Sequence, residues 1–221
     1  MLTGFKGHKK INLEKFKEAQ DPNQFAISLA GEPTLYPFLA ELIKELRKQG
    51  KTSFLVTNGL LPEKLKELKK KNALPTQIYI SLNSPNKLMY EKWHKSSVKN
   101  AWEKFNESLS LFPKLKTKTR TVIRITLVKN LNMKTEHIED YVKLIKKAKP
   151  DFIEVKGYMS VGFARKRLGY EKMPFHMEIK DFSKKIIKKL IDYKILDEKE
   201  ESRVILLGKS KANMKIKKKE I

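Results

Sequence analysis

Five short apolar runs, each followed by or containing polar or glycine residues, most constrain the fold of this chain. Parallel strands that are buried on both faces read as continuous hydrophobic runs, and in barrel-like α/β folds the site lies on the loops at the carboxyl ends of the strands. Polar residues that recur at those ends therefore indicate one shared site. The five runs are residues 25–29, 53–56, 78–82, 122–128 and 152–155.

Helical patterns separate these runs. Sequential strands that alternate with helices imply right-handed crossovers and a parallel sheet. The sheet is either an open doubly wound sheet or an arc of a barrel, and the pattern alone does not decide between them. The predicted strands are 25–29, 52–57, 77–82, 120–128, 151–155 and 202–207. The predicted helices are 11–19, 37–49, 63–71, 85–93, 98–112 and 135–148, with a further helix from residue 181.

The spacing of apolar residues also predicts which helix side chains are buried. Pro113 is expected to end helix 98–112, because proline lacks the N–H that a helix interior needs. The side chains expected on buried helix faces are Leu39, Leu42, Ile43 and Leu46 and, in the last helix, Ile186, Ile187, Leu190 and Ile191.

Size and composition indicate one domain with a tail. The chain has 221 residues, of which 40% are hydrophobic, so it can bury one substantial core. We expect an α/β domain over 1–208 and a disordered lysine-rich tail over 209–221, because the tail has little to bury. No apolar run is long enough to cross a bilayer, and the N-terminus lacks the apolar segment of a secretory signal. A cytoplasmic protein without a membrane partner is therefore expected.

Basic residues outnumber acidic residues. The 49 Lys and Arg residues against 25 Asp and Glu residues give a formal net charge of +24. A charge of this size attracts polyanions, and nucleic acid is the natural partner. The alternative interpretation is that the excess is lysine on exposed helix faces, and composition leaves both interpretations open.

The chain contains no cysteine. It therefore offers no disulfide, no thiol nucleophile and no thiolate ligand for zinc or an iron–sulfur cluster. The four histidines lie far apart in the sequence and lack the spacing of metal ligands. No metal site is predicted.

The first polar cluster, Gly31, Glu32 and Pro33, follows the strand predicted at 25–29. Glycine lets a ligand approach the main chain, and proline fixes the backbone that orients the Glu32 carboxylate. A carboxylate suits an ammonium group better than a phosphate. The cluster therefore predicts a site for an amino group.

Polar side chains also accompany the next three runs. Thr57 and Asn58 offer a hydroxyl and an amide, and Ser81 and Asn83 point to the opposite face of their strand from the apolar residue between them. Arg124 lies within an apolar run, where its charge is costly unless it meets a carboxylate or a phosphate. Together these residues suit a zwitterionic ligand that carries a ribose. They do not identify a catalytic residue.

A basic cluster, Arg165, Lys166 and Arg167, lies in the loop predicted after the fifth strand. A phosphate backbone that passes the carboxyl edge of the sheet can be bound there, and the alternative is a solvated run of charge. Phe163 and Tyr158 lie beside the cluster and are candidates for stacking on bases. This loop is the predicted RNA-binding region.

Several segments in a fixed order carry a family resemblance. They are 27–37, 55–59, 80–86, 124–129, 152–159, 161–168 with 173–174, and 202–207. With these segments the chain resembles the radical S-adenosylmethionine superfamily, and in particular the tRNA 4-demethylwyosine synthases of archaea and eukaryotes. Gly-Glu-Pro alone is a weak signal, but the ordered series is specific and extends over nearly the whole chain except the lysine tail.

The resemblance implies a partial (β/α)6 barrel that binds S-adenosylmethionine against a [4Fe-4S] cluster and cleaves it to a 5′-deoxyadenosyl radical. In that family the radical acts on N1-methylguanosine beside the anticodon of phenylalanine tRNA, tRNA-Phe. Pyruvate supplies two carbons, and the product is 4-demethylwyosine. The resemblance thus implies a lyase of wybutosine biosynthesis.

The resemblance also implies roles for the site residues. Gly31, Glu32 and Pro33 would hold the amino group of the methionine part of the cofactor, and Arg124 its carboxylate. Asn83 stands where the family pattern has an acidic residue. The remainder of the cofactor site would be lined by Thr57, Asn58, Ser81 and Asn83.

The most severe departure from the family concerns the cluster ligands. The first strand of the superfamily ends in a Cys-x3-Cys-x2-Cys loop that holds the cluster, and this sequence has no such loop. We therefore expect a barrel without its first strand and cluster loop, inactive without a cysteine-bearing segment. The explanations are a gene model that begins at an internal methionine, a split enzyme with a separate cysteine-bearing N-terminal fragment, or a remnant. The remnant, or a non-catalytic basic subunit that binds tRNA, is the alternative function.

Overall fold

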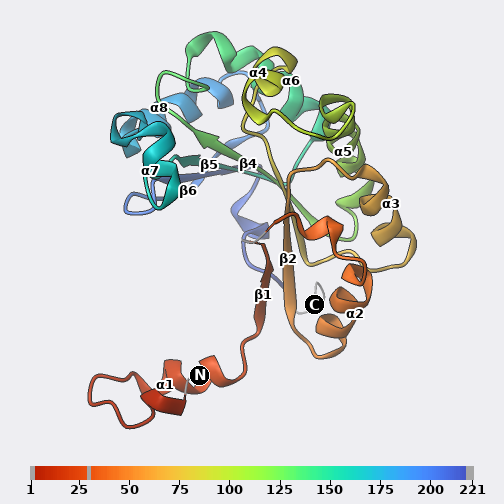
Figure 1. The fold of residues 1–221 in the computed structure, drawn as a ribbon, viewed down its shortest axis with the longest axis vertical. Coiled ribbons are helices and arrows are strands. Elements are labelled where there is room, and N and C mark those ends of the chain that lie inside the picture. The colour runs from red at the N-terminus through yellow and green to blue at the C-terminus, as the bar shows by residue number, and fades with distance from the viewer. Residues whose placement is uncertain (1–2, 29–30, 218–221) are drawn as a thin grey trace.

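The computed structural model describes residues 3–28 and 31–217, which form a curved seven-stranded sheet covered by helices (Figure 1). The strands are β1 (Gln24–Ile27), β2 (Thr52–Thr57), β3 (Gln77–Ser81), β4 (Arg120–Leu127), β5 (Phe152–Gly157), β6 (Lys194–Lys199) and β7 (Val204–Gly208). The α-helices are α1 (Leu13–Gln20), α2 (Leu39–Lys48), α3 (Pro62–Lys70), α4 (Lys87–His94), α5 (Ala101–Leu115), α6 (Ile138–Ala148), α7 (Phe163–Leu168) and α8 (His176–Ile187). Among the described residues, every helix is too short or too polar to span a membrane.

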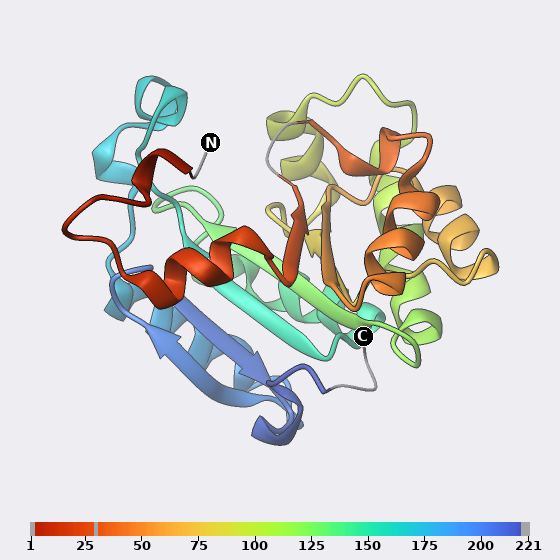
Figure 2. The same ribbon diagram turned by 90° about the horizontal axis from the view of Figure 1, so that it is seen from below.

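The strand order identifies the sheet as an arc of a barrel. The order is β1-β2-β3-β4-β5-β7-β6, and β1 to β5 are parallel neighbours in chain order. A doubly wound sheet reverses its order at a switch point and carries helices on both faces. Here each crossover adds the next strand on the same side, and Figures 1 and 2 show the covering helices along the outer side of the curved sheet. The predicted α/β fold is confirmed, and the sheet is not closed.

The main core lies between the sheet and these helices. Leu55 on β2, Ile80 on β3 and Ile125 on β4 have no exposed surface and belong to this core. Burial of each such side chain contributes about 1.5–3 kcal/mol. The inner face of the sheet carries a smaller apolar cluster around Val122 and Phe152, and many of its other side chains are only half-buried. The inner face is therefore the open side of the arc.

Two predictions of buried helix side chains and one prediction of a helix end are wrong. Leu42 is 38% exposed, because the 100° step per residue places it at the margin of the buried stripe of α2. Ile191 is 99% exposed, because α8 ends at Ile187 and the helical spacing no longer applies beyond it. Pro113 lies inside α5, which continues to the buried Leu115. A proline in the last turn removes one main-chain hydrogen bond, and the burial of Leu115 offsets that loss.

The sequence did not indicate strand β6. Most of its side chains are exposed and only Leu196 is buried, so it lacks the apolar pattern of the parallel strands. It pairs antiparallel with β7, which in turn pairs antiparallel with β5. Pairing with β7 therefore makes this segment a strand.

Residues 209–217 run back toward the inner face of the sheet. Met214 packs beside the inner apolar cluster, and Arg120 Nη1 donates a hydrogen bond to its carbonyl at 2.9 Å. The predicted disorder of 209–221 falls partly on residues 218–221, which lie outside the described residues. The division into a domain over 1–208 and a tail stays a prediction.

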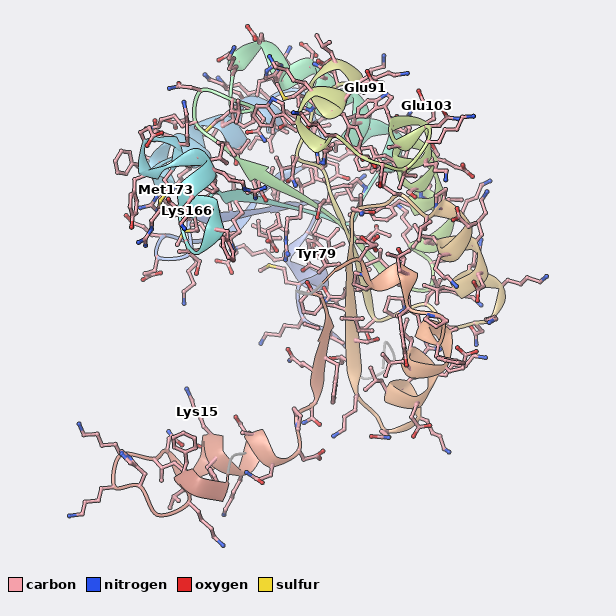
Figure 3. The ribbon with its side chains drawn as sticks, in the orientation of Figure 1. Lys15, Tyr79, Glu91, Glu103, Lys166 and Met173 are labelled. Atoms are coloured by element: carbon pink, nitrogen blue, oxygen red, sulfur yellow. The ribbon has the colours of Figure 1, made fainter. Side chains whose placement is uncertain are left out.

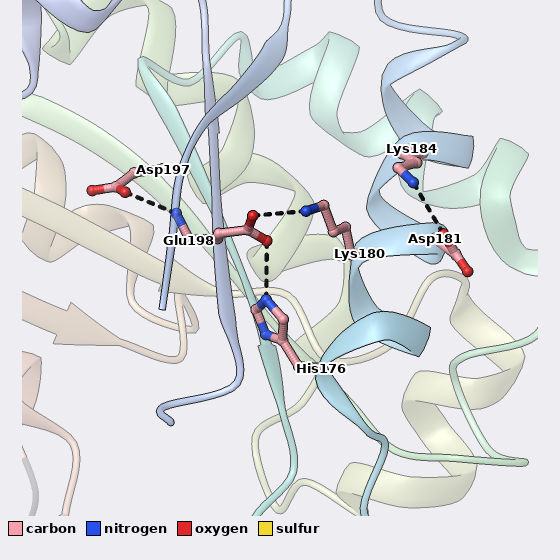
Figure 4. Close-up of polar contacts among 6 residues, drawn as sticks. All are labelled: His176, Lys180, Asp181, Lys184, Asp197 and Glu198. Carbon is pink, nitrogen blue, oxygen red and sulfur yellow. Dashed lines mark hydrogen bonds and ion pairs between the residues drawn. The ribbon is translucent and has the colours of Figure 1, made fainter. Parts of the chain in front are cut away.

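Ion pairs connect α8 to the edge strand β6. The Glu198 carboxylate accepts a hydrogen bond from Lys180 Nζ at 2.7 Å and lies 3.0 Å from His176 Nε2 (Figure 4). These two partners lower the pKa of Glu198, and the hydrogen bond from Lys180 is the larger cause. The folded chain therefore favours the ionised carboxylate.

Glu198→Gln is expected to remove part of the acid sensitivity of the fold. Because the folded pKa is lowered, the contribution of this carboxylate is present above the ordinary value of 4.5 and is lost as pH falls through the folded pKa. Urea unfolding of parent and variant at neutral pH and at about pH 3, below most unperturbed carboxyl pKa values, measures this. The difference in stability should shrink at the lower pH, and an equal difference at both would contradict the prediction.

Candidate functional site

The carboxyl ends of β1 to β5 lie along one edge of the sheet, and the predicted ligand-binding residues lie at or near these ends. This is the edge at which sites form in parallel α/β sheets. Figure 3 shows the side chains around the concave side of the arc, where Tyr79 lies. The carboxyl edge of the sheet therefore adjoins the open inner face of the arc.

The Glu32 carboxylate joins the loop after β1 to the end of β2. Its Oε1 accepts hydrogen bonds from Thr34 N at 3.1 Å, Thr34 Oγ1 at 2.6 Å and Thr57 Oγ1 at 2.6 Å. Its Oε2 accepts from Asn58 N at 2.8 Å. Glu32 also caps the 3-10 helix η2 (Pro33–Leu35). The carboxylate is thus committed to four protein donors. The carbonyls of Glu32 and Pro33 accept from Leu35 N and Tyr36 N, both at 3.0 Å, so among these three residues the Gly31 carbonyl is the acceptor without a partner among the described residues.

Gly31 and Pro33 shape the same loop. Gly31 has a φ of +75°, in the left-handed region that other residues avoid, and a Cβ there would meet no atom within 4 Å. Backbone conformation rather than crowding therefore requires glycine. Pro33 is the first residue of η2, where its missing N–H costs nothing.

Thr57 and Asn58 end β2 in different environments. Thr57 is 2% exposed and shares the helix-covered side with Leu55, so its hydroxyl binds Glu32 instead of lining the inner face. Asn58 is exposed, and its Oδ1 accepts from Leu60 N at 2.9 Å. Of the two side chains, Asn58 is the one a ligand can reach.

Ser81, Arg124 and Glu154 lie side by side on three neighbouring strands of the inner face. Arg124 Nε is 2.8 Å from Glu154 Oε1, and its Nη2 donates to Oε2 at 3.3 Å. The guanidinium carbon is 4.7 Å from the centre of the Tyr79 ring. Glu154 thus supplies the carboxylate that a half-buried arginine needs, while Nη1 and the Ser81 hydroxyl have no partner among the described residues.

The environment of this pair also acts on Tyr79. Burial raises the pKa of the Tyr79 hydroxyl, and the Glu154 charge raises it further, against the opposing charges of Arg124 and Arg120. Tyr79 is therefore a neutral hydroxyl at physiological pH. It contributes a hydrogen-bonding group and a ring face beside the guanidinium.

Asn83 and Asn132 tie the ends of β3 and β4 together. Asn83 Oδ1 accepts from Thr126 N at 3.1 Å. Asn132 is 1% exposed; its Nδ2 donates to the carbonyls of Asn83 and Thr126, both at 2.8 Å, and its Oδ1 accepts from Val128 N at 2.7 Å. The side-chain oxygen of Asn83 is therefore used by the protein, and its Nδ2 is the group left for a ligand.

Two groups of predicted residues thus form at this edge. Hydrogen bonds join Glu32, Thr57 and Asn58, and strand register joins Ser81 and Arg124; no described contact links the first group to the second. Sequence reasoning missed Thr34, Glu154 and Asn132. Glu154 could have been found as a charge within a predicted strand, but its pairing with Arg124 depends on register.

The basic cluster lies on α7, a short helix in a segment expected to be a loop. Arg165, Lys166 and Arg167 are all exposed, and the Arg165 guanidinium carbon is 5.1 Å from the centre of the Tyr170 ring. Tyr158 is 7% exposed and its hydroxyl donates to Ala164 O at 2.8 Å. Tyr158 therefore supports α7 from below and is not a free stacking surface.

The described residues were considered for a metal site. Within residues 3–28 and 31–217, no group of three or more His, Cys, Asp or Glu side chains is placed to hold a metal ion. Beside the loop that Glu32 anchors, the free Nη1 of Arg124 and the Ser81 hydroxyl suit an organic ligand with a carboxylate and hydroxyl groups.

Two family models match the chain. The radical SAM superfamily model matches residues 12–145, and the model for wyosine base formation matches residues 147–209. Together these two matches extend over most of the chain.

Curated relatives match along most of this chain. A protein of Pyrococcus abyssi named S-adenosyl-L-methionine-dependent tRNA 4-demethylwyosine synthase is 45% identical over 207 residues, which are 94% of this chain and 59% of the relative. A protein of the same name from Methanocaldococcus jannaschii is 41% identical over 90% of this chain and 60% of its own length. The chain thus spans about three fifths of the length of these relatives.

Solved structures show the same similarity. A structure of TYW1 with a lysine–pyruvate adduct bound has a TM-score of 0.81 and 39% identity, over 94% of this chain and 64% of that one. The crystal structure of an archaeal TYW1 has a TM-score of 0.76 and 37% identity, over 98% and 67% of the two chains. The chain therefore belongs to the radical SAM superfamily, in its tRNA 4-demethylwyosine synthase family.

Proposed function

We propose that this chain forms the S-adenosylmethionine-binding barrel of a radical SAM enzyme that converts N1-methylguanosine in tRNA-Phe to 4-demethylwyosine. The observation that carries the proposal is that the Glu32-anchored loop and the Ser81–Arg124 group lie along the same carboxyl edge of a sheet that belongs to this family. The names of the relatives support the tRNA product, and the lysine–pyruvate adduct in a related TYW1 supports pyruvate as co-substrate.

The cofactor contacts follow from the free groups at this edge. The Gly31 carbonyl, together with the second lone pairs of the Glu32 and Pro33 carbonyls, would hold the amino group, because the Glu32 carboxylate is already bound by four donors. Arg124 Nη1 would bind the carboxylate. Ser81 Oγ and the side-chain nitrogens of Asn83 and Asn58 would reach the ribose and base, and Thr57 would act through Glu32.

The iron–sulfur cluster of the superfamily does not fit this chain. The 221 residues include no cysteine. When a cluster is present, bound S-adenosylmethionine supplies a 5′-deoxyadenosyl radical. Cysteines outside these residues, in the same polypeptide or in a separate cysteine-bearing chain, would have to provide the cluster ligands. The proposal includes lyase activity for the whole enzyme. It also includes loss of that activity when the cysteine-bearing segment is missing.

In this proposal, the basic residues of α7 bind the RNA. Arg165, Lys166 and Arg167 are exposed beyond the end of β5, on the side of the sheet where the candidate site lies. Guanidinium and ammonium groups bind phosphates, and the net charge of +24 favours approach of a polyanion. We expect the phosphate backbone of tRNA to pass over this helix.

The absence of cysteine also favours a second candidate function, a non-catalytic subunit that binds tRNA. The two functions differ in cofactor affinity. The enzyme requires binding of S-adenosylmethionine at the carboxyl edge, whereas the subunit requires only salt-sensitive tRNA binding. S-adenosylmethionine binding by the parent chain therefore separates them.

Arg124→Ala is expected to weaken S-adenosylmethionine binding by at least about tenfold, because a hydrogen bond to a charged group contributes about 1.5–3 kcal/mol. Ligand-observed NMR measures this, since it detects the weak binding expected without a cluster. Arg167→Ala, an exposed arginine on α7, is the matched control and should bind like the parent. Equal binding by Arg124→Ala and the parent would remove Arg124 from the site. A parent that does not bind the cofactor would favour the subunit.

A further inference from the structure

A concentration of exposed apolar side chains surrounds α7. Fourteen described large hydrophobic side chains are exposed, and six of them lie between residues 159 and 177. We refer to these six as the α7 surface. They are Met159, Val161, Phe163, Tyr170, Phe175 and Met177. Six exposed apolar side chains within nineteen residues exceed what singly scattered exposed residues give, so this segment is a candidate interaction surface.

Cations accompany two of the three aromatic rings of this surface. Arg165 lies over Tyr170, with 5.1 Å between its guanidinium carbon and the ring centre. Phe175 has two cations within reach: Lys129 Nζ at 4.9 Å and the Arg203 guanidinium carbon at 5.9 Å from its ring centre. These cations come from three separate segments of the chain, so the pairing of ring and charge is a product of the fold.

The cations beside Phe175 are held in place. Lys129 Nζ is 2.9 Å from Glu178 Oε2, and Arg203 Nη1 donates to Pro174 O at 3.1 Å. Phe175 itself remains 64% exposed. Cations that the protein already holds lose little conformational freedom when a partner binds at the exposed ring beside them.

The charged residues in the segment of the α7 surface favour a negatively charged partner. Between residues 159 and 177, four Lys or Arg residues stand against one acidic residue, Glu171. Exposed rings beside cations are the arrangement that binds unpaired nucleotides, because bases stack on the rings while the cations neutralise the phosphates. A duplex does not offer its base faces. The surface therefore fits single-stranded RNA better than a protein or a paired stem.

The α7 surface is attached to the ends of the strands that carry the candidate site. Lys129 N, two residues past β4, donates to Lys172 O at 2.9 Å, and Tyr158, directly after β5, supports Ala164 of α7. Figure 3 shows Lys166 and Met173 together at one rim of the concave side. An RNA strand bound on the α7 surface would lie beside the open inner face of the sheet.

We infer that the α7 surface binds unpaired nucleotides of the RNA substrate, by stacking on Phe163, Tyr170 and Phe175, next to the base that enters the site. This inference rests on the proposed function and adds the recognition mode: Arg165, Lys166 and Arg167 bind phosphate in any RNA, and the rings select unpaired bases. The aromatic side chains thus determine specificity for a loop.

The test compares two RNAs of equal length, a stem with a seven-nucleotide loop (about the size of an anticodon loop) and a blunt duplex, by fluorescence anisotropy with the full chain. The double variant Phe163→Ala with Phe175→Ala is expected to lose at least about tenfold in affinity for the stem-loop and to change little for the duplex. Phe163→Leu with Phe175→Leu keeps apolar bulk without rings and should lose a similar factor. Ile191→Ala, which alters a side chain that is 99% exposed elsewhere, is the control and should bind both RNAs like the parent.

Two outcomes would overturn the inference: stem-loop affinity that is unchanged in the double alanine variant, or an equal loss for both RNAs. Unchanged RNA binding with a loss of self-association in gel filtration would assign the surface to a second copy of the chain instead. S-adenosylmethionine binding measured on the same samples separates the two claims. If it persists while the RNA result is negative, only this inference fails; if the parent lacks it, the proposed enzyme function fails whatever the RNA result.

Discussion

Glu32→Ala is expected to lower the free energy of unfolding by about 3 kcal/mol and to weaken S-adenosylmethionine binding as well. The Glu32 carboxylate accepts four hydrogen bonds, from Thr34 N, Thr34 Oγ1, Thr57 Oγ1 and Asn58 N. A hydrogen bond to a charged group contributes about 1.5–3 kcal/mol, and the partial exposure of Glu32 reduces the sum. Urea unfolding followed by circular dichroism measures the stability, and ligand-observed NMR measures the binding.

Glu32→Gln tests whether the charge or the shape of the side chain matters. Glutamine keeps the length, but its NH2 group faces a donor on at least one side, so it should recover only part of the stability. Glu91→Ala, an exposed glutamate on α4, is the control and should unfold like the parent. If Glu32→Ala unfolds like the parent and yet loses cofactor binding, the carboxylate touches the ligand, as the sequence predicted, and the connection between loops is secondary.

Asn132→Ala is expected to lower the free energy of unfolding by about 4 kcal/mol. The substitution leaves Val128 N–H and the carbonyls of Asn83 and Thr126 without their partner in a site where Asn132 is 1% exposed. An unsatisfied buried polar group costs about 1–3 kcal/mol. The ends of β3 and β4 should separate, so binding of S-adenosylmethionine beside Ser81 should weaken with the stability. Urea unfolding and ligand-observed NMR measure both effects.

Asn132→Asp distinguishes the donors from the acceptor of this side chain. The carboxylate can still accept from Val128 N, but it cannot donate, and it places a negative charge against the carbonyls of Asn83 and Thr126. Its loss of stability should therefore equal or exceed that of Asn132→Ala. A loss below about 1 kcal/mol for either variant would mean that water replaces the amide and that Asn132 does not hold the edge together.

The main elements of the fold could be predicted because their signals are local. The strands at β2 and β4 coincide with continuous apolar runs, and α3 begins at Pro62, where proline is favoured. Strand β6 could not be predicted, because only its pairing with β7 makes it a strand. The exposure of Ile191 was missed because a helical period gives no information about where the helix ends.

The candidate site was predictable as a set of residues but not as a set of contacts. Polar residues at strand ends indicated Glu32, Ser81 and Arg124, and all of them lie at the carboxyl edge or beside it. The pairing of Glu154 with Arg124 depends on strand register, and Asn132, which binds Asn83, gave no comparable signal. The assignment of Glu32, Ser81 and Arg124 to cofactor binding stays a prediction, and the experiments on Arg124 and Glu32 test it.

By itself the sequence determined the alternation of strands and helices, the edge on which polar residues collect, the positive charge and the family. Each of these depends on residue type and spacing along the chain. Only the tertiary structure decided that the sheet is an arc, that Thr57 binds Glu32 across 25 positions, and that Asn132 holds Asn83 across 49. Such contacts depend on strand register and crossover side, which arise from burying all the strands together and cannot be read from any one segment.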